Sequence, residues 1–255
     1  MSKHPSMMFS ASQGQKFLRC PSKWYWEYIK GHKSPASKPM LDGIEIHSYV
    51  QFALAYLLVV PEGRLGDAAR SLLKYLPRQA PPELVEIQFR AAPEMLGFPA
   101  WVRGIIDLVT VEPRGLVVQD HKTRSNLKWA LTALELKTDF QIRLYALIVA
   151  RTIKWRGPVI VQHNNVMRSK PHTVRIVSTT LSVADIDATQ EHVRRTFEAM
   201  VYCASLPVEW VGWNKAACDD YKSRLNPDGC PHRHRCLALG RDVGGDLAHW
   251  YRLNP

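Results

Sequence analysis

The chain has 255 residues, of which 46% are hydrophobic, so it can bury a sizeable core and wholesale disorder is excluded. Lys and Arg total 34 against 23 acidic residues, a formal net charge of +11. That charge favours a polyanionic partner, nucleic acid first, although a basic soluble protein without such a partner is the alternative.

The sequence also bears on compartment. The segment from Met1 to Ser10 has no apolar core of signal-peptide length. The apolar stretches near 50–60 and 144–149 fall short of the ~20 residues of a membrane span. We therefore expect a cytoplasmic protein that does not enter a membrane. Its five cysteines are an odd number, and a cytosolic setting argues against a disulfide framework.

The chain opens with a predicted helical region over 10–76. Ser10 and Gln13 fit the capping box S-x-x-Q, and Pro21 suggests a break or a second helix start. The other segments predicted here are a disordered start over 1–9, a basic loop over 30–39, and helices over 43–60 and 64–75.

A predicted core over 83–205 follows, and a hairpin forms its centre. The apolar run from Trp101 to Glu112 meets the turn signal Pro113-Arg114-Gly115, after which the run resumes. The remaining predicted elements are strands over 84–91, 158–167 and 173–180, a single helix over 134–153, and a helix over 183–204 that Ser182 and Asp185 cap. This order predicts an α/β fold with a central mixed sheet flanked by helices, followed by a Cys-rich tail over 206–255.

Three charged side chains interrupt the apolar hairpin. Asp107 lies among residues that look buried, and Asp120 and Lys122 end the second strand on one face. Buried charges must be paired or bind metal, so this group predicts a cradle for a divalent cation and a phosphate. The alternatives are a structural Asp107 bound to backbone or to Arg103, and a solvated strand end.

The acid-x-Lys pattern is weak by itself, because a chain of this length shows about two such triplets by chance. The pattern also occurs at Glu135-x-Lys137 and at Asp220-x-Lys222. The first of these lies in a helical pattern, where residues two apart do not share a face, and the second lies in the irregular tail. Asp120-x-Lys122 alone follows a β-branched apolar strand.

The order and spacing of several signals resembles a known family, the PD-(D/E)XK nuclease superfamily, and within it the RecB-like branch. That branch includes the nuclease domains of recombination helicases and the CRISPR-adaptation nucleases. The matching motifs are Gly43-x-x-x-His47, Gly104-x-x-Asp107, Asp120-x-Lys122-Thr123 and Gln141-x-x-x-Tyr145. The stretch from Ser10 to Trp26 also resembles the branch's opening helix. The resemblance implies a restriction-endonuclease-like fold over roughly residues 8 to 240.

The resemblance implies a role for each motif residue. Asp107 and Asp120 would bind Mg²⁺ or Mn²⁺, and Lys122 would orient the attacking water or stabilise charge on the phosphate. The other implied residues are His47 and the backbone carbonyl of His121 as metal ligands, and Gln141 and Tyr145 as residues that position the substrate or the lysine. Oxygen ligands suit hard cations, and an imidazole favours Mn²⁺. Glu86 stands where many relatives carry an acidic residue.

The implied activity is phosphodiester hydrolysis in DNA, with an exonuclease acting on ends or single strands as the expectation from relatives. Recombination, repair or CRISPR adaptation are the processes implied. The sequence has no G-x-x-x-x-G-K-[ST] phosphate loop, so any helicase partner would be a separate chain. Basic and aromatic residues over 122–129 and 154–156 could contact DNA, or form solvated loops. The alternative function is a non-catalytic nucleic-acid-binding protein of the same fold.

The cysteines carry a second expectation. Cys20 with Cys218, Cys230 and Cys236 resembles the set that binds a [4Fe-4S] cluster in part of the RecB-like branch, and would hold the tail on the N-terminal helix. The gap between the first two tail cysteines is longer than in those relatives. A Zn²⁺ site that uses His232 or His234, or free thiols, are the alternatives, and Cys203 is expected to be an ordinary buried thiol.

Overall fold

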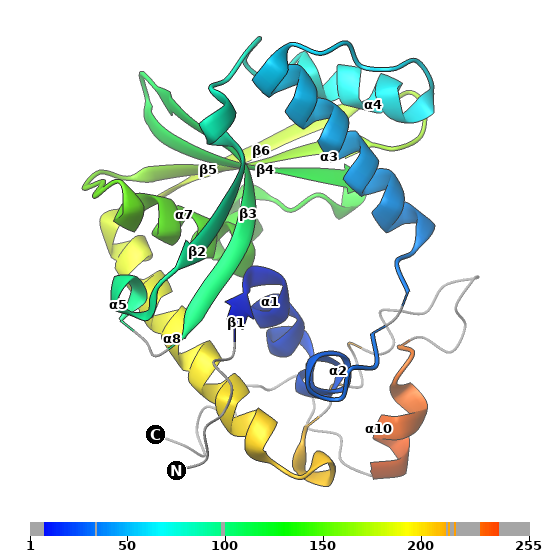
Figure 1. The fold of residues 1–255 in the computed structure, drawn as a ribbon, viewed down its shortest axis with the longest axis vertical. Helices are drawn as coiled ribbons and strands as arrows, with labels where there is room; N and C mark the ends of the chain where they lie inside the picture. The colour runs from blue at the N-terminus through cyan, green and yellow to red at the C-terminus, as the bar shows by residue number, and fades with distance from the viewer. Residues whose placement is uncertain are drawn as a thin grey trace. The chain divides into compact units, whose positions relative to one another are not determined.

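The computed structural model describes residues 8–33, 35–97, 100–212, 214, 217 and 230–239 (Figure 1). The chain divides into two compact units, each described by itself below. The first comprises Met1–Met8 and Ala36–Glu191, and the second comprises Phe9–Pro35 and His192–Pro255. The boundary falls within helix α8 (Val183–Ser205). The single nuclease domain expected from the sequence stays a prediction.

A mixed sheet forms the centre of the first unit, which confirms the predicted fold class. Its strands are β2 (Val85–Ala91), β3 (Trp101–Glu112), β4 (Gly115–Arg124), β5 (Val159–Met167) and β6 (Val174–Leu181). Strands β2, β3 and β4 pair antiparallel, β4 and β5 pair parallel, and β5 and β6 pair antiparallel. The predicted turn closes the β3–β4 hairpin at the pair Glu112 and Gly115, where Gly115 has a φ of 124°, accessible to glycine.

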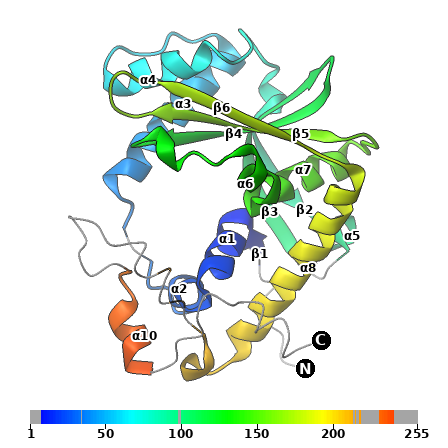
Figure 2. The ribbon, with the colours of Figure 1, turned by 180° about the vertical axis from the view of Figure 1, so that it is seen from behind.

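Helices cover both faces of this sheet (Figures 1 and 2). One face carries α3 (Lys38–Tyr56) and α4 (Arg64–Leu73), and the other carries α6 (Ala133–Thr138) and α7 (Phe140–Thr152). Short helices complete the unit: α5 (Pro93–Leu96) and the 3₁₀ turns Pro82–Leu84 and Leu127–Trp129. Buried Ile46, Val50 and Leu54 of α3 share one apolar core with Leu108 and Val166 of the sheet. Among the described helices, none combines the length and apolar character that a membrane crossing requires.

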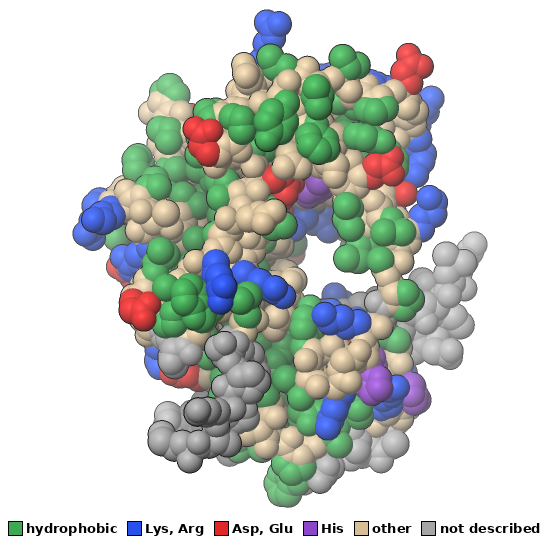
Figure 3. All heavy atoms as spheres, viewed as in Figure 1, with side chains coloured by type: hydrophobic (Ala, Val, Ile, Leu, Met, Phe, Trp, Pro, Cys, Tyr) green, Lys and Arg blue, Asp and Glu red, His purple; other side chains and the backbone are tan. Residues whose placement is uncertain are grey.

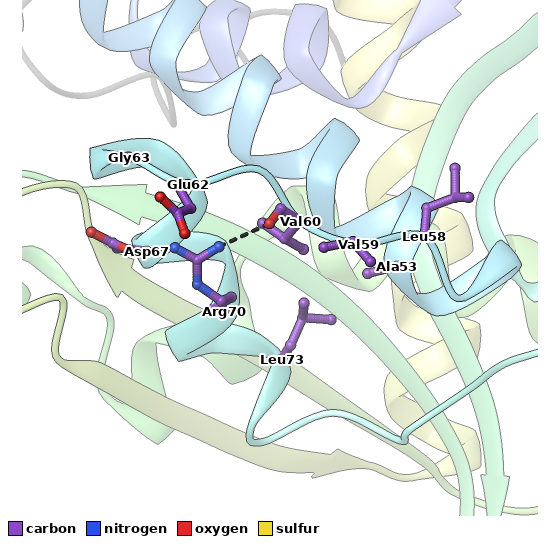
Figure 4. Close-up of a pocket in the computed structure, with 9 residues that line it drawn as sticks. All are labelled: Ala53, Leu58, Val59, Val60, Glu62, Gly63, Asp67, Arg70 and Leu73. Carbon is purple, nitrogen blue, oxygen red and sulfur yellow. Dashed lines mark hydrogen bonds and ion pairs between the residues drawn. The ribbon is translucent and has the colours of Figure 1, made fainter.

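A pocket of about 700 Å³ lies between the end of α3 and α4. Figure 4 shows Arg70 in it, donating a hydrogen bond to the Val60 carbonyl oxygen at 2.9 Å. Hydrophobic side chains gather on the surface over these helices (Figure 3). Phe52, Tyr56, Leu58 and Val59, at and beyond the end of α3, are exposed. None of the residues lining the pocket is one of the acidic or basic residues of the predicted metal site, so this pocket is not the candidate catalytic centre.

Three predicted boundaries are wrong. The helix expected from residue 43 begins at Lys38, because Pro39 is tolerated in a first turn. The single helix over 134–153 is two helices, broken at Asp139, whose side chain accepts a hydrogen bond from the Ile142 N–H at 3.0 Å and caps α7. Strand β1 (Met8–Ser10) occupies the end of the start expected to be disordered, and its Phe9 is fully buried.

The second unit contains the N-terminal helices and the tail. Helix α1 (Ala11–Arg19) is capped by Ser10, whose side chain accepts a hydrogen bond from the Gln13 N–H as predicted, and α2 (Pro21–Trp24) starts at the expected proline. A π-helical turn (Tyr25–Ile29), a 3₁₀ turn (Val208–Trp210) and α10 (Arg233–Leu239) follow. Ser22 Oγ donates to the Val211 carbonyl at 3.1 Å, so the tail is hydrogen-bonded to the N-terminal helices.

A buried carboxylate also joins these segments. Glu27 forms ion pairs with Lys16 and, at 3.9 Å, with Lys23, and its Oε1 lies 3.8 Å from Nε2 of His232. Burial by itself raises the pKa of Glu27, but His232 and Lys16 outweigh it and hold the pKa below its ordinary value. Because the pKa of Glu27 is lower in the folded state than in the unfolded state, its ionised form stabilises the fold at a pH above the unfolded-state pKa. This contribution is lost as the pH falls through the folded-state pKa.

We predict that Glu27→Gln lowers the free energy of unfolding at pH 7 by about 1–3 kcal/mol, because it leaves two ammonium groups without their carboxylate. Chemical denaturation measures the change, and the difference from wild type should shrink at about pH 3. Glu198→Gln, which breaks the exposed 2.6 Å pair with Arg194, is the control and should cost less than about 1 kcal/mol. An equal loss for Glu27→Gln at both pH values would contradict this account.

Candidate active site

The structure brings the three charged residues of the hairpin together. Asp107 and Asp120 are both buried, and Lys122 Nζ lies 2.7 Å from Asp120 Oδ2. The second oxygen of Asp107 accepts a hydrogen bond from the His121 N–H, so strand β4 itself orients this carboxylate. The structural alternatives for Asp107 were a bond to the backbone or to Arg103, and the bond to the backbone is present in addition to the contacts with charged side chains.

Two more ligand-type side chains complete the cluster. His47 Nδ1, from α3, lies 3.6 Å from Asp107 Oδ1 and 3.7 Å from Glu86 Oε1. Among the described residues, His47, Glu86 and Asp107 form the one group of three potential metal ligands whose donor atoms all lie within 4.8 Å of one another. Glu86 has a φ of 49°, a left-handed conformation that costs energy for a non-glycine residue and is typical of functional sites.

The charges of the cluster shift one another's pKa values. Burial by itself raises the pKa of Asp107, but His47 outweighs it and lowers the pKa to about 2. Burial raises the pKa of Asp120 to about 6, with Lys122 opposing and Asp107 adding to the rise. Burial lowers the pKa of His47, yet Asp107 and Glu86 reverse this and raise it to about 10. The cluster therefore contains three carboxyl groups, Glu86, Asp107 and Asp120, whose charges His47 and Lys122 partly compensate.

The donor set fits a divalent cation. Asp120 Oδ2 is buried, and its contacts are ionic, with Lys122 Nζ at 2.7 Å and His163 Nε2 at 3.4 Å. Carboxylate oxygens from β2, β3 and β4 with one imidazole match the preferences of Mg²⁺ and Mn²⁺. His121 presents its N–H to Asp107, and whether its carbonyl binds metal stays a prediction.

Helix α7 supports the lysine. Lys122 Nζ donates to Gln141 Oε1 at 2.9 Å, and Gln141 Nε2 donates to the Tyr145 hydroxyl at 3.0 Å. Gln141 and Tyr145 are one turn apart, so the helix presents both to the same strand. The structure thus brings together the motif residues that lie on four separate elements, and their individual roles stay predictions.

Sequence reasoning missed the polar side chains of β5, which pairs in parallel with β4. His163 is in register with Asp120 and Asn165 with Lys122, and both are buried. His163 Nε2 lies 3.4 Å from Asp120 Oδ2, and burial lowers the pKa of His163 to about 3, so the ring is neutral. The signal was the polar run Gln162 to Asn165 inside an apolar strand pattern, which only a partner strand with polar groups explains.

The cysteine prediction falls in the second unit. Cys20, Cys230 and Cys236 are buried and share one apolar cluster with Ala217 and Trp26. Cys203 is a buried free thiol, as expected. Cys218 lies outside the described residues, so the structure describes three of the four predicted ligands. Burial raises the pKa of Cys236 to about 11 and also raises that of Cys20, so bound metal would be needed to hold these groups as thiolates.

Comparisons with known proteins agree with this geometry. The model of the PD-(D/E)XK nuclease superfamily matches residues 51–237, more than half of the chain. The chain belongs to that superfamily. The matched span includes Asp107, Asp120 and Lys122, whereas His47 precedes it.

One solved structure shows the same fold. A protein from Eubacterium rectale named "putative exonuclease" is 13% identical, with a TM-score of 0.51, covering 76% of this chain and 80% of its own. A protein named SSO0001 is 14% identical with a TM-score of 0.44 and covers 82% of each chain. No curated protein matches significantly.

One glycine controls how closely α3 approaches the strand of the lysine. A Cβ at Gly43 would lie 2.8 Å from Thr123 Oγ1, next to Lys122. Gly43 precedes His47 by about one helical turn, so the close approach at Gly43 sets the position of the imidazole.

We predict that Gly43→Ala weakens Mn²⁺ binding about 10-fold and lowers the free energy of unfolding by about 1–3 kcal/mol, because the helix must move off β4. Calorimetric titration with Mn²⁺ and denaturant unfolding measure the two effects. Ser48→Ala, which removes only a hydrogen bond within α3 to Ile44 at 3.1 Å, serves as the control. Unchanged Mn²⁺ affinity in Gly43→Ala would show that this contact does not position His47.

Proposed function

We propose that the protein is a metal-dependent DNA nuclease that hydrolyses phosphodiester bonds. One observation carries the proposal: the Lys122 ammonium is held between Asp120 and Gln141, beside the group formed by His47, Glu86 and Asp107. A cation next to a lysine that is itself fixed in place fits a reaction in which negative charge grows on a phosphate.

The cation would be held by Asp107 and Asp120, with His47 and Glu86 beside them, and Mg²⁺ or Mn²⁺ fits these donors. When bound, it would supply activation of water and compensation of charge on the scissile phosphate. His163 contacts Asp120 from the neighbouring strand, and the His121 N–H contacts Asp107, so both carboxylates are held in fixed orientations.

Lys122 acts as a cation in this proposal. Burial by itself lowers the pKa of Lys122, but Asp120 and Asp107 outweigh it and raise the pKa, so the ammonium keeps its proton at neutral pH. It donates hydrogen bonds to the phosphate or orients the water, while Gln141 and Tyr145 fix its position.

The substrate proposed is DNA, attacked at ends or in single strands in recombination, repair or CRISPR adaptation in the cytoplasm. The net charge of +11 supports a polyanionic substrate. On the same unit, Trp129 is 63% exposed with Lys128 Nζ at 4.8 Å from its ring, an arrangement suited to stacking on unpaired bases. A helicase would join as a separate chain.

We predict that end-labelled linear DNA, single- or double-stranded, is degraded with Mg²⁺ or Mn²⁺ and left intact with EDTA. Lys122→Met should lower the rate at least about 10²-fold, because it removes the charge and keeps the side-chain volume. Lys74→Met, at the exposed end of α4, is the matched control and should keep full activity. Intact DNA with a folded wild-type protein in every metal would favour the non-catalytic nucleic-acid-binding alternative.

We also propose that Cys20, Cys218, Cys230 and Cys236 hold a [4Fe-4S] cluster. The proximity of the three described cysteines supports a shared ligand. Four thiolates are the usual complement for such a cluster.

Protein purified without oxygen should therefore absorb visible light and contain iron, and Cys230→Ser should lose both properties. Cys203→Ala is the matched control, since Cys203 is buried but outside the predicted ligand set. Zinc in place of iron, or a colourless metal-free wild type, would overturn the cluster.

A further inference from the structure

Arg124 is a second basic residue on the strand that carries the lysine. It ends β4, two residues beyond Lys122, so strand alternation places both side chains on the same face. Its Nε donates to Asn165 Oδ1 at 3.2 Å, and Asn165 is the parallel-strand partner of Lys122. The guanidinium therefore lies on the side of the sheet where the candidate active site is built.

A buried amide fixes the orientation of this guanidinium. Asn165 is fully buried, and its Nδ2 donates to the His163 carbonyl at 3.3 Å and to the Arg175 carbonyl at 3.2 Å. With both ends of the amide committed, Oδ1 points at Arg124 and cannot easily turn away. An asparagine with no solvent contact and no apolar role is well suited to positioning its neighbour.

The rest of the guanidinium has no partner. Within the described residues, the bond to Asn165 is the single hydrogen bond of the Arg124 guanidinium, and no ion pair includes this group. The side chain is half-buried, and an arginine keeps its charge. Asp120 and Asp139 are the carboxylates that act on it electrostatically, without direct contact. A partly desolvated cation with free N–H donors is poised for an anion.

We propose that Arg124 binds a DNA phosphate next to the one that is cleaved. The proposal rests on the proposed nuclease function and adds a substrate subsite to it. Residues two apart on a strand are separated by about 6.6–6.8 Å, comparable with the spacing of successive phosphates along an extended single strand. Lys122 thus faces the scissile phosphate while Arg124 faces its neighbour, and Asn165 aims the planar guanidinium so that it can make paired hydrogen bonds.

The test combines a protein variant with a neutralised phosphate. Short single-stranded oligodeoxynucleotides are prepared with one uncharged methylphosphonate at each successive position. Their binding is measured by fluorescence anisotropy in Mg²⁺, with Lys122→Met present in every protein so that the DNA stays intact. Arg124→Gln is compared with Arg114→Gln, an exposed arginine beside the start of the same strand that pairs with Glu112. Thermal unfolding confirms that each variant folds.

We expect Arg124→Gln to weaken binding of the unmodified strand about 10-fold and to reduce the salt slope by about 0.7. A methylphosphonate at one position should weaken binding to the protein that retains Arg124 and have no effect on Arg124→Gln. The two changes should not add, because one removes the arginine and the other removes the phosphate charge of the same contact. Arg124→Lys should recover part of the affinity, and Asn165→Ala should weaken binding at the same position.

The outcomes separate this inference from the proposed function. If DNA binds and the wild-type protein cleaves it, but Arg124→Gln keeps the same sensitivity at every methylphosphonate position, the phosphate subsite is wrong and the nuclease stands. If Arg124→Gln weakens binding equally at all positions without loss of any one sensitivity, the residue acts only through general charge, which also overturns the subsite. If wild type neither binds nor cleaves DNA, the proposed function itself fails.

Discussion

The arrangement of the candidate site depends on two carboxylates that are buried on neighbouring strands of one sheet. Asp107 and Asp120 repel each other at short range in a medium that screens charge poorly, so each needs a partner that reduces its charge or fixes its direction. Strand β4 provides the His121 N–H for Asp107 and the Lys122 ammonium for Asp120. Helix α3 provides His47, which contacts Asp107. The charges of Asp107, Asp120, Lys122 and His47 therefore compensate one another within one buried cluster.

Residues on helices and strands contact the charged groups of this cluster and fix their positions. Helix α7 holds Lys122 through Gln141, and strand β5 places His163 against Asp120. Helix α3 can approach only because Gly43 has no side chain above Thr123. His47, Glu86 and Asp107 all lie on helices or strands, which hold side chains in place more precisely than loops do.

Much of this arrangement could be predicted from the sequence. The features that could not be predicted depend on contacts between residues far apart in the chain. Local signals placed the β3–β4 hairpin, the Ser182 and Asp185 cap and the α1 start, because turns and caps are set by neighbours in sequence. The break at Asp139 was missed, since the apolar period continues across it and only the cap reveals it. Asn165 was missed because its role depends on a partner forty residues away in the chain, and strand periodicity alone carries no such information.

The parallel pairing of β4 with β5 has a consequence for the order in which the molecule is made. A parallel pair needs a crossover, here the stretch containing α6 and α7, so His163 and Asn165 are synthesised well after Asp120 and Lys122. Until the ribosome has released that crossover, the buried carboxylates have neither their neighbouring strand nor the lysine's helix. A truncated or nascent chain therefore leaves Asp107 and Asp120 of the hairpin without the residues of α7 and β5 that surround them in the complete fold.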